Sequence, residues 1–184
     1  MSKFFNADLL SKKKIKPLTL VFIQQQEKRK LLLGLKKRGF GMNKFNGFGG
    51  KVEAQDLSIK HAAERELMEE AGICATNLIK RGLIIFEFDP HIESSVLEVH
   101  VYSSPDYTGE ITESEEMKPE WFDFQGIPYE KMWVDDAIWF PLLLENPTQL
   151  FKGHFIFSDF SNIQEYELVK VESLDEIGSF VLKE

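Results

Sequence analysis

The stretch that decides the fold runs from Gly49 to Ile73 and reads GGKVEAQDLSIKHAAERELMEEAGI. Its second half, from Ser58 to Ala71, is rich in residues that favour helices. Gly72 follows it, and glycine readily adopts the left-handed conformation that ends many helices. The sequence therefore predicts a glycine loop followed by a helix.

This helix carries an acidic stripe. At about 100° per residue, with Glu66 at zero, Glu70 lies at about 40° and Glu69 at about 300°. The apolar row of the helix overlaps this stripe, whereas a solvated acidic face would lie opposite the core. Arg65 compensates only part of the repulsion. Because Mg²⁺ binds carboxylates together with substrate phosphates, the stripe indicates a metal and phosphate site, with an ordinary glutamate-rich surface helix as the alternative.

The stretch resembles the signature of the Nudix family, a glycine loop followed by R-E-U-x-E-E-x-G-U with U aliphatic, which Arg65–Ile73 matches. The resemblance implies an α+β Nudix fold, a mixed central β-sheet flanked by helices with a loop–helix–loop catalytic motif. It also implies a hydrolase that uses Mg²⁺, for which Mn²⁺ can substitute. The implied catalytic residues are Glu66, Glu69, Glu70 and Arg65, and the implied metal ligands are Gly50, Glu66, Glu69, Glu70 and Glu116. For Glu116 an ordinary surface position is the alternative.

One feature departs from the family pattern. Arg65 follows Gly50 by fifteen residues, whereas the pattern has fourteen. Counting forward places the acidic position of the loop at Asp56, and counting back places it at Leu57. We expect the extra residue in the loop or the first helical turn, where an insertion costs little, with the catalytic run intact.

Stretches outside the signature resemble the branch of the family that hydrolyses oxidised purine nucleoside triphosphates. They are Lys36–Gly41, Asn46–Val52, Phe86–Phe88, Val99–Val101, Glu115–Met117, Met132–Trp133, Asp135–Asp136 and Trp139–Leu144. The implied substrates are 8-oxo-dGTP, 2-oxo-dATP and related nucleotides, cleaved to the monophosphate and pyrophosphate. The implied role is sanitation of the nucleotide pool.

The same resemblance assigns a substrate pocket. Its residues are Thr19 and Lys36 at the base or sugar end, together with Phe40, Asn46, Phe86, Leu97, Met117, Trp133, Asp135, Asp136 and Trp139. Asn46 offers donors and an acceptor to a purine edge. If Asp135 and Asp136 converge on one base, they cannot both ionise cheaply, so one keeps a proton and donates. Helix capping is the alternative for the aspartates, and core packing is the alternative for Phe86 and Trp139.

Three departures from that branch concern the size of the pocket. Phe45 stands where the family has a tryptophan, Val134 replaces a proline, and Leu97 replaces a methionine. None of these changes adds or removes a charge. We therefore expect a different pocket volume with the same chemistry.

The whole chain has 184 residues, 43% of them hydrophobic, and a net charge of −8. These values indicate one globular domain. We expect a basic, flexible extension at residues 1–16 and a Nudix domain at 17–184. The expected strands are Leu18–Gln24, Lys30–Lys36, Ile79–Phe88, Val96–Tyr102, Trp121–Phe124, Phe151–Phe157 and Tyr166–Val171. The second expected helix is Asp135–Glu145, where Pro141 must lie in the first turn or kink the helix.

Charge and hydropathy indicate which kinds of binding partner to expect. An acidic body disfavours binding to a nucleic acid polymer. The longest apolar runs fall well short of the roughly 20 residues that cross a bilayer. We expect a cytoplasmic monomer, with the mitochondrial or nuclear nucleotide pool as alternatives. Other functions left open are hydrolysis of ADP-ribose, capped RNA or diphosphoinositol polyphosphates, and a non-catalytic Nudix module, although all three helical glutamates are present.

Overall fold

A computed structural model describes residues 4–177 and shows, within them, an eight-stranded mixed sheet. The sheet order is β10-β9-β5-β6-β1-β2-β3, and β8 also pairs with β2. The strands are β1 (Ile15–Gln25), β2 (Lys30–Lys36), β3 (Phe45–Asn46), β5 (Ile79–Phe88), β6 (Val96–Ser104), β8 (Met117–Asp123), β9 (Leu150–Asp159) and β10 (Asn162–Val171). Two pairs are parallel, β1 with β6 and β5 with β9.

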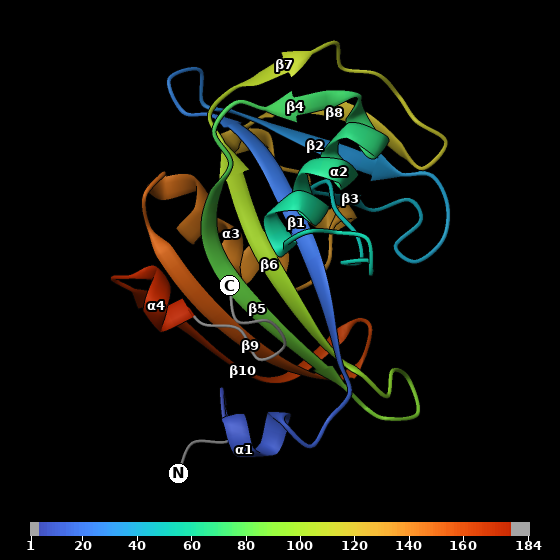
Figure 1. Cartoon of the computed structure of the whole chain (residues 1–184), viewed down its shortest axis with the longest axis vertical. Helices are drawn as coiled ribbons and strands as arrows, with labels where there is room; N and C mark the ends of the chain where they lie inside the picture. The colour runs from blue at the N-terminus through green and yellow to red at the C-terminus, as the bar shows by residue number, and fades with distance from the viewer. Residues whose placement is uncertain (1–3, 178–184) are drawn as a thin grey trace.

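The two longer helices cover opposite faces of this sheet (Figure 1). Helix α2 (Ile59–Ala71) packs against β1 through a core that includes Leu67 and Val21. Helix α3 (Asp136–Glu145) packs on the other face, where Trp139 contacts the ring of Phe22 edge to face. Successive side chains of a strand point to opposite faces, so β1 supports both cores.

The α+β class and the mixed sheet are confirmed. Each expected strand exists, Lys30–Lys36 and Ile79–Phe88 with the expected ends and the others with shifted ends. The expected Trp121–Phe124 strand begins earlier, at Met117, and ends at Asp123, because β8 pairs along all of β2. A small second sheet, β4 (Ile73–Ala75) with β7 (Tyr107–Gly109), was not predicted. Pro141 lies inside α3 rather than in its first turn. Within residues 4–177, no helix has both the length and the apolar character that a membrane span requires.

The domain boundary predicted after Lys16 differs from the packing in the structure. Strand β1 begins at Ile15, and Leu10, in helix α1 (Ala7–Leu10), is only 1% exposed. Leu10 packs with Leu83 and Ile85 on the face of the sheet opposite α3. The lysines of this segment indicate a solvated tail, but the apolar residues among them pack against the sheet. Short helices α4 (Leu174–Ile177), η1 (Phe124–Gly126) and η2 (Tyr129–Lys131) complete the fold.

Leu10→Ala is expected to lower the free energy of unfolding by about 2 kcal/mol or more, because it empties a buried leucine site. Chemical denaturation measures this loss. Ser11→Ala, at an exposed neighbouring position, serves as the control. If both variants unfold like the wild type, residues 7–16 do not contribute to the core.

Candidate active site

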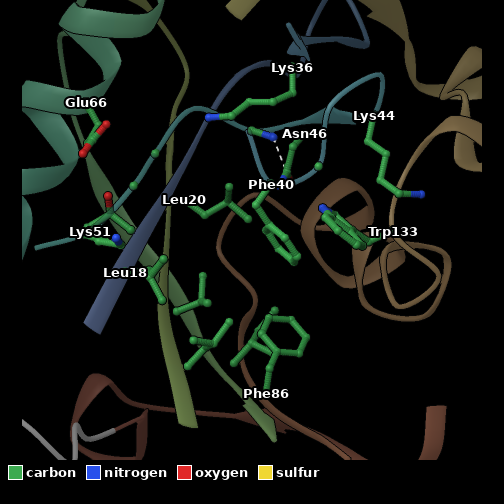
Figure 2. Close-up of a pocket in the computed structure, with 18 of the residues that line it drawn as sticks. Leu18, Leu20, Lys36, Phe40, Lys44, Asn46, Lys51, Glu66, Phe86 and Trp133 are labelled. Carbon is green, nitrogen blue, oxygen red and sulfur yellow. Dashed lines mark hydrogen bonds between the residues drawn. The ribbon is translucent and has the colours of Figure 1, made fainter. Parts of the chain in front are cut away.

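One cavity of about 580 Å³ brings the predicted site residues together. Its lining extends from the α2 glutamates, across the glycine loop, to the start of α3, and Figure 2 shows the side chains pointing into it. Among the predicted residues, the lining includes Thr19, Lys36, Phe40, Asn46, Gly50, Arg65, Glu66, Glu69, Phe86, Leu97, Glu116, Met117, Trp133, Asp135, Asp136 and Trp139. Glu70 lies behind this surface and is 3% exposed.

Gly49 and Gly50 of the glycine loop fit between β1 and α2 only because they have no side chains. A Cβ atom on Gly49 would lie 2.0 Å from the carbonyl oxygen of Thr19, and one on Gly50 would lie 2.5 Å from Oε1 of Glu66. The N–H of Thr19 donates to the carbonyl of Gly50 at 2.8 Å. The backbone of Gly50 is therefore held directly against the Glu66 carboxylate.

Helix α2 begins and ends as its sequence predicts. The hydroxyl of Ser58 accepts from the N–H of His61, and Gly72 adopts φ 71° in the left-handed region. Glu66 and Glu69 face the cavity, while Glu70 points beneath the loop and accepts from the N–H of Gly49 at 2.8 Å. Glu66 and Glu70 of the predicted acidic stripe therefore lie against the glycine loop, whereas the side chain of Glu69 is 58% exposed.

Arg65 ties this stripe together. Its Nη1 donates to Glu66 at 3.0 Å and to Glu69 at 3.1 Å. Its Nε and Nη2 donate to the two carboxylate oxygens of Asp56 at 3.0 and 2.9 Å. The structure therefore assigns the acidic loop position to Asp56, while Leu57 is 89% exposed. The extra residue therefore lies between Asp56 and Arg65.

Asp56 has no solvent-exposed side-chain surface, and its hydrogen bonds from Arg65 lower its pKa to about 2. This pair aims the guanidinium at the glutamates, so Asp56 acts through Arg65. Asp56→Asn is expected to lower kcat about 10- to 100-fold, the usual cost of losing a partner that orients metal ligands. Steady-state kinetics over a Mg²⁺ titration measures the loss.

The same substitution affects acid stability. Since the pKa of Asp56 is lower in the folded protein than in the unfolded chain, the ion pair stabilises the fold above about pH 4 and this stabilisation is lost as the pH falls toward 2. The variant lacks that contribution at neutral pH. Gln55→Ala, in the exposed part of the loop, is the control. Wild-type kcat in Asp56→Asn would contradict the positioning role.

A cation already bridges carboxylates at this end of the cavity. The ammonium of Lys36 contacts Glu70 at 3.3 Å and also forms an ion pair with Glu116. Lys36 therefore lies at the glutamate end, not at the base or sugar end as predicted. Glu116 is 39% exposed in its side chain, but it belongs to the site rather than to open surface.

The carboxylates at this end lack full compensation for their charge. Burial raises the pKa of Glu66, and it raises that of Glu70 to about 7. Within residues 4–177, no three acidic, histidine or cysteine side chains are close enough to form a metal site as they stand. The oxygen-rich donors and the ammonium that bridges Glu70 and Glu116 nevertheless fit a hard divalent cation in their chemistry.

The opposite end of the cavity holds two buried aspartates. Asp135 accepts from the indole N–H of Trp139 at 3.0 Å, and Asp136 accepts from the backbone N–H of Trp133 at 2.9 Å. Asp135 makes no side-chain capping bond to α3, so the capping alternative is wrong for it. Burial raises both pKa values, and the charge of Asp135 raises that of Asp136 further. The pair therefore retains a proton more readily than isolated aspartates.

Two polar residues complete the lining between these ends. The amide oxygen of Asn46 accepts from the N–H of Gly47 at 2.8 Å, which leaves its NH₂ group as the available donor. Because an amide oxygen has two lone pairs, the two-way pairing of Asn46 with a purine edge stays a prediction. The hydroxyl of Thr19 is buried and has no hydrogen-bond partner.

Aromatic and aliphatic side chains form the walls. Phe86 is half-buried at the lining, and Trp139 is 1% exposed, so Trp139 is both core and site. Sequence reasoning missed several lining residues, which are Leu18, Leu20, Lys44, Lys51, Glu53, Phe88, Phe157 and Phe160. Leu18 and Leu20 flank Thr19 and point to the opposite face of β1, so strand alternation counted from Thr19 could not have identified them. The other missed residues come from distant segments that only the fold brings together.

The fold and this site define a nucleotide hydrolase of the glycine-loop and glutamate-helix type. A family model described as the NUDIX domain matches residues 15–143. The chain therefore belongs to the Nudix family, and it has the Nudix fold.

Curated relatives are similar over most of the chain. The oxidized purine nucleoside triphosphate hydrolase of Danio rerio is 46% identical over 159 residues, which cover 86% of this chain and 97% of the relative. The enzyme of the same description from Mus musculus is 46% identical over 155 residues, covering 84% and 95%.

Solved structures agree on the fold. A mutator MutT protein from Bacillus halodurans superposes with a TM-score of 0.72 at 25% identity, covering 83% of this chain and 97% of that one. A MutT Nudix hydrolase from Burkholderia pseudomallei superposes with a TM-score of 0.56 at 21% identity, covering 63% and 88%. The latter supports the fold alone.

Proposed function

We propose that this protein hydrolyses oxidised purine nucleoside triphosphates, including 8-oxo-dGTP and 2-oxo-dATP, to the monophosphate and pyrophosphate, and so removes them from the nucleotide pool. The observation that carries the proposal is one cavity with the α2 glutamates at one end and the buried pair Asp135 and Asp136 at the other. The first end suits phosphates and a cation, and the second suits a base. The curated relatives of the same description support this assignment.

We propose Mg²⁺ as the cofactor, with Mn²⁺ as a substitute. Glu66, Glu69, Glu70 and Glu116 would hold it with the carbonyl of Gly50. When bound, the cation neutralises phosphate charge and lowers the pKa of an attacking water. Arg65 keeps two of the glutamates aimed at the cavity, and the ammonium of Lys36 would supply positive charge to a phosphate at this end.

The base would be selected at the other end. One oxygen of each aspartate is engaged by an N–H group, and the other oxygen can face the base edge. The donor group of Asn46 adds a further contact. The surrounding aromatic walls exclude water, which strengthens each of these hydrogen bonds.

The test is a turnover screen with purified protein in Mg²⁺, Mn²⁺ or EDTA. Substrates are 8-oxo-dGTP, 2-oxo-dATP, dGTP, ADP-ribose and a capped oligonucleotide, with product analysis for pyrophosphate. We expect the two oxidised nucleotides to have the highest kcat/KM and EDTA to abolish turnover. Preference for ADP-ribose or the capped oligonucleotide would assign another Nudix activity, and no turnover of any substrate would favour a binding module.

We also propose that the protein acts as a cytoplasmic monomer on free nucleotides, without a membrane or a nucleic acid polymer as partner. The net charge of −8 opposes binding to a polymer of phosphates. Light scattering of the purified protein tests the monomer.

A further inference from the structure

Trp133 lines the base end of the cavity and offers a purine a flat surface for stacking, and this surface is covered by Phe40. Its ring lies 4.8 Å from that of Trp133 between centroids, at an interplanar angle of 24°. This is the offset stacking that aromatic rings favour. Figure 2 shows Phe40 pointing into the cavity on one side of Trp133 and Lys44 on the other side. The ammonium of Lys44 lies 4.9 Å from the Trp133 ring centroid.

A second ring holds Phe40 in this position. Phe160 lies in the turn between β9 and β10, far along the chain from Phe40, yet their ring centroids are 5.0 Å apart with an angle of 66°. Phe160 also contacts Phe88 of β5 at 5.3 Å. The turn therefore anchors the Phe40 loop to the sheet across the mouth of the cavity.

Backbone hydrogen bonds hold the loop that carries Phe40, among them Met42 N–H to the carbonyl of Gly39 at 3.2 Å and Lys44 N–H to that of Gly41 at 3.0 Å, but they do not fix the side chain of Phe40. Gly39, Gly41 and Asn43 all have positive φ, at 72°, 82° and 68°. Its base is closed by the N–H of Asn43, which donates to the carbonyl of Lys36 at 2.8 Å. Phe40 itself is 60% exposed. The contacts of its ring with Trp133 and Phe160 therefore decide where this side chain rests.

We propose that Phe160 is a positioning residue that holds Phe40 stacked on Trp133, so that a purine must displace Phe40 before it stacks there. This inference rests on the proposed function, because it concerns the base end of the same cavity. A protein whose binding-competent state is only partly populated binds with reduced apparent affinity. Phe160 therefore sets the affinity for the base without touching the phosphates.

The kinetic test compares Phe160→Ala with the wild type on 8-oxo-dGTP. Removing one aromatic contact is expected to lower KM about two- to tenfold, because the stacked state loses that contribution. We expect kcat to stay unchanged, since the chemistry begins after the base is seated. Phe160→Tyr keeps the ring and should restore the wild-type KM. Tyr166→Ala, which removes a half-exposed ring of the same hairpin outside the cavity, is the matched control.

A spectroscopic test needs no substrate. The chain has three tryptophans, so its ¹H–¹⁵N spectrum has three indole signals, assigned by single Trp→Phe variants. Phe160→Ala should move the Trp133 signal in the direction seen in Phe40→Ala and leave the other two unmoved. A KM that is unchanged or raised, or an unmoved Trp133 signal, overturns the proposal. If the wild type turns over no nucleotide, the proposed function fails, but the spectrum still tests the stack.

Discussion

Glu70→Gln is expected to lower kcat for 8-oxo-dGTP by about 10²–10⁴-fold, the range that a directly participating acid or base contributes. The substitution keeps the size of the side chain and its ability to accept from the N–H of Gly49. It removes the negative charge that, with Glu66, would hold the cation against the phosphates. Steady-state kinetics in Mg²⁺ measures the loss. Glu64→Gln, on the exposed side of the same helix, is the control and should retain the wild-type rate.

Stability separates this loss from misfolding. Burial raises the pKa of Glu70 from 4.5 to about 7. Between these two pH values the folded protein keeps a proton on Glu70 that the unfolded chain has released. The stability due to the protonated group is therefore present at low pH and lost as the pH rises from about 4.5 through 7. Glu70→Gln cannot ionise, so its metal-free form should be at least as stable as the wild type above pH 7.

Thermal unfolding with and without Mg²⁺ provides the second readout. A ligand that binds only the folded state raises its Tm, so Mg²⁺ should raise the Tm of the wild type more than that of Glu70→Gln. A folded Glu70→Gln protein with the wild-type rate and the wild-type response to Mg²⁺ would show that this helix does not hold the catalytic cation.

The sequence was sufficient where local pattern and chemistry agree. Helix α2 has a serine cap, a run of helix formers and a terminal glycine, and it forms from Ile59 to Ala71. Strand β5 was predicted with the residue limits it has in the structure, and its centre, Leu83–Phe86, is a continuous apolar run. The pairing of β5 with β9, some 70 residues away, depends on the whole fold and could not be deduced from these runs.

Site residues were predicted where the family signature defines them. They were missed where the direction of a side chain or a contact between distant segments decides their place. Counting along the loop could not choose between Asp56 and Leu57, because that choice depends on which side chain Arg65 reaches. Lys36 was placed at the wrong end of the cavity, because its long side chain turns toward Glu116. Phe160 joins the site only through the turn between β9 and β10, and no local pattern connects this turn to the loop that carries Phe40.

The aspartate pair yields a prediction about base selection. An 8-oxoguanine edge presents a carbonyl acceptor at C6, whereas a 2-oxoadenine edge presents an amino donor there. A site with fixed donors would leave one of them unpaired, at a cost of about 1–3 kcal/mol. Because Asp135 and Asp136 are buried together with raised pKa values, one shared proton can face either edge.

Asp135→Asn should favour 8-oxo-dGTP over 2-oxo-dATP by about tenfold or more. The indole N–H of Trp139 needs an acceptor, so the amide oxygen of the new asparagine turns toward it and the NH₂ group faces the base. A fixed donor suits the carbonyl at C6 and opposes the amino group. Asp136→Ala removes a reading group altogether and should lower kcat/KM for both nucleotides.

The pH dependence of kcat/KM tests whether the two aspartates share a proton. With the wild type, kcat/KM for both nucleotides should fall at high pH, when both aspartates ionise and no donor remains. In Asp135→Asn this loss should be weaker for 8-oxo-dGTP, because the amide donates at every pH. The measurement is kcat/KM against pH for both substrates with the three proteins. The same substrate ratio and the same profile in all three would mean that the aspartates only support the fold around Trp133 and Trp139, and that the base is read elsewhere.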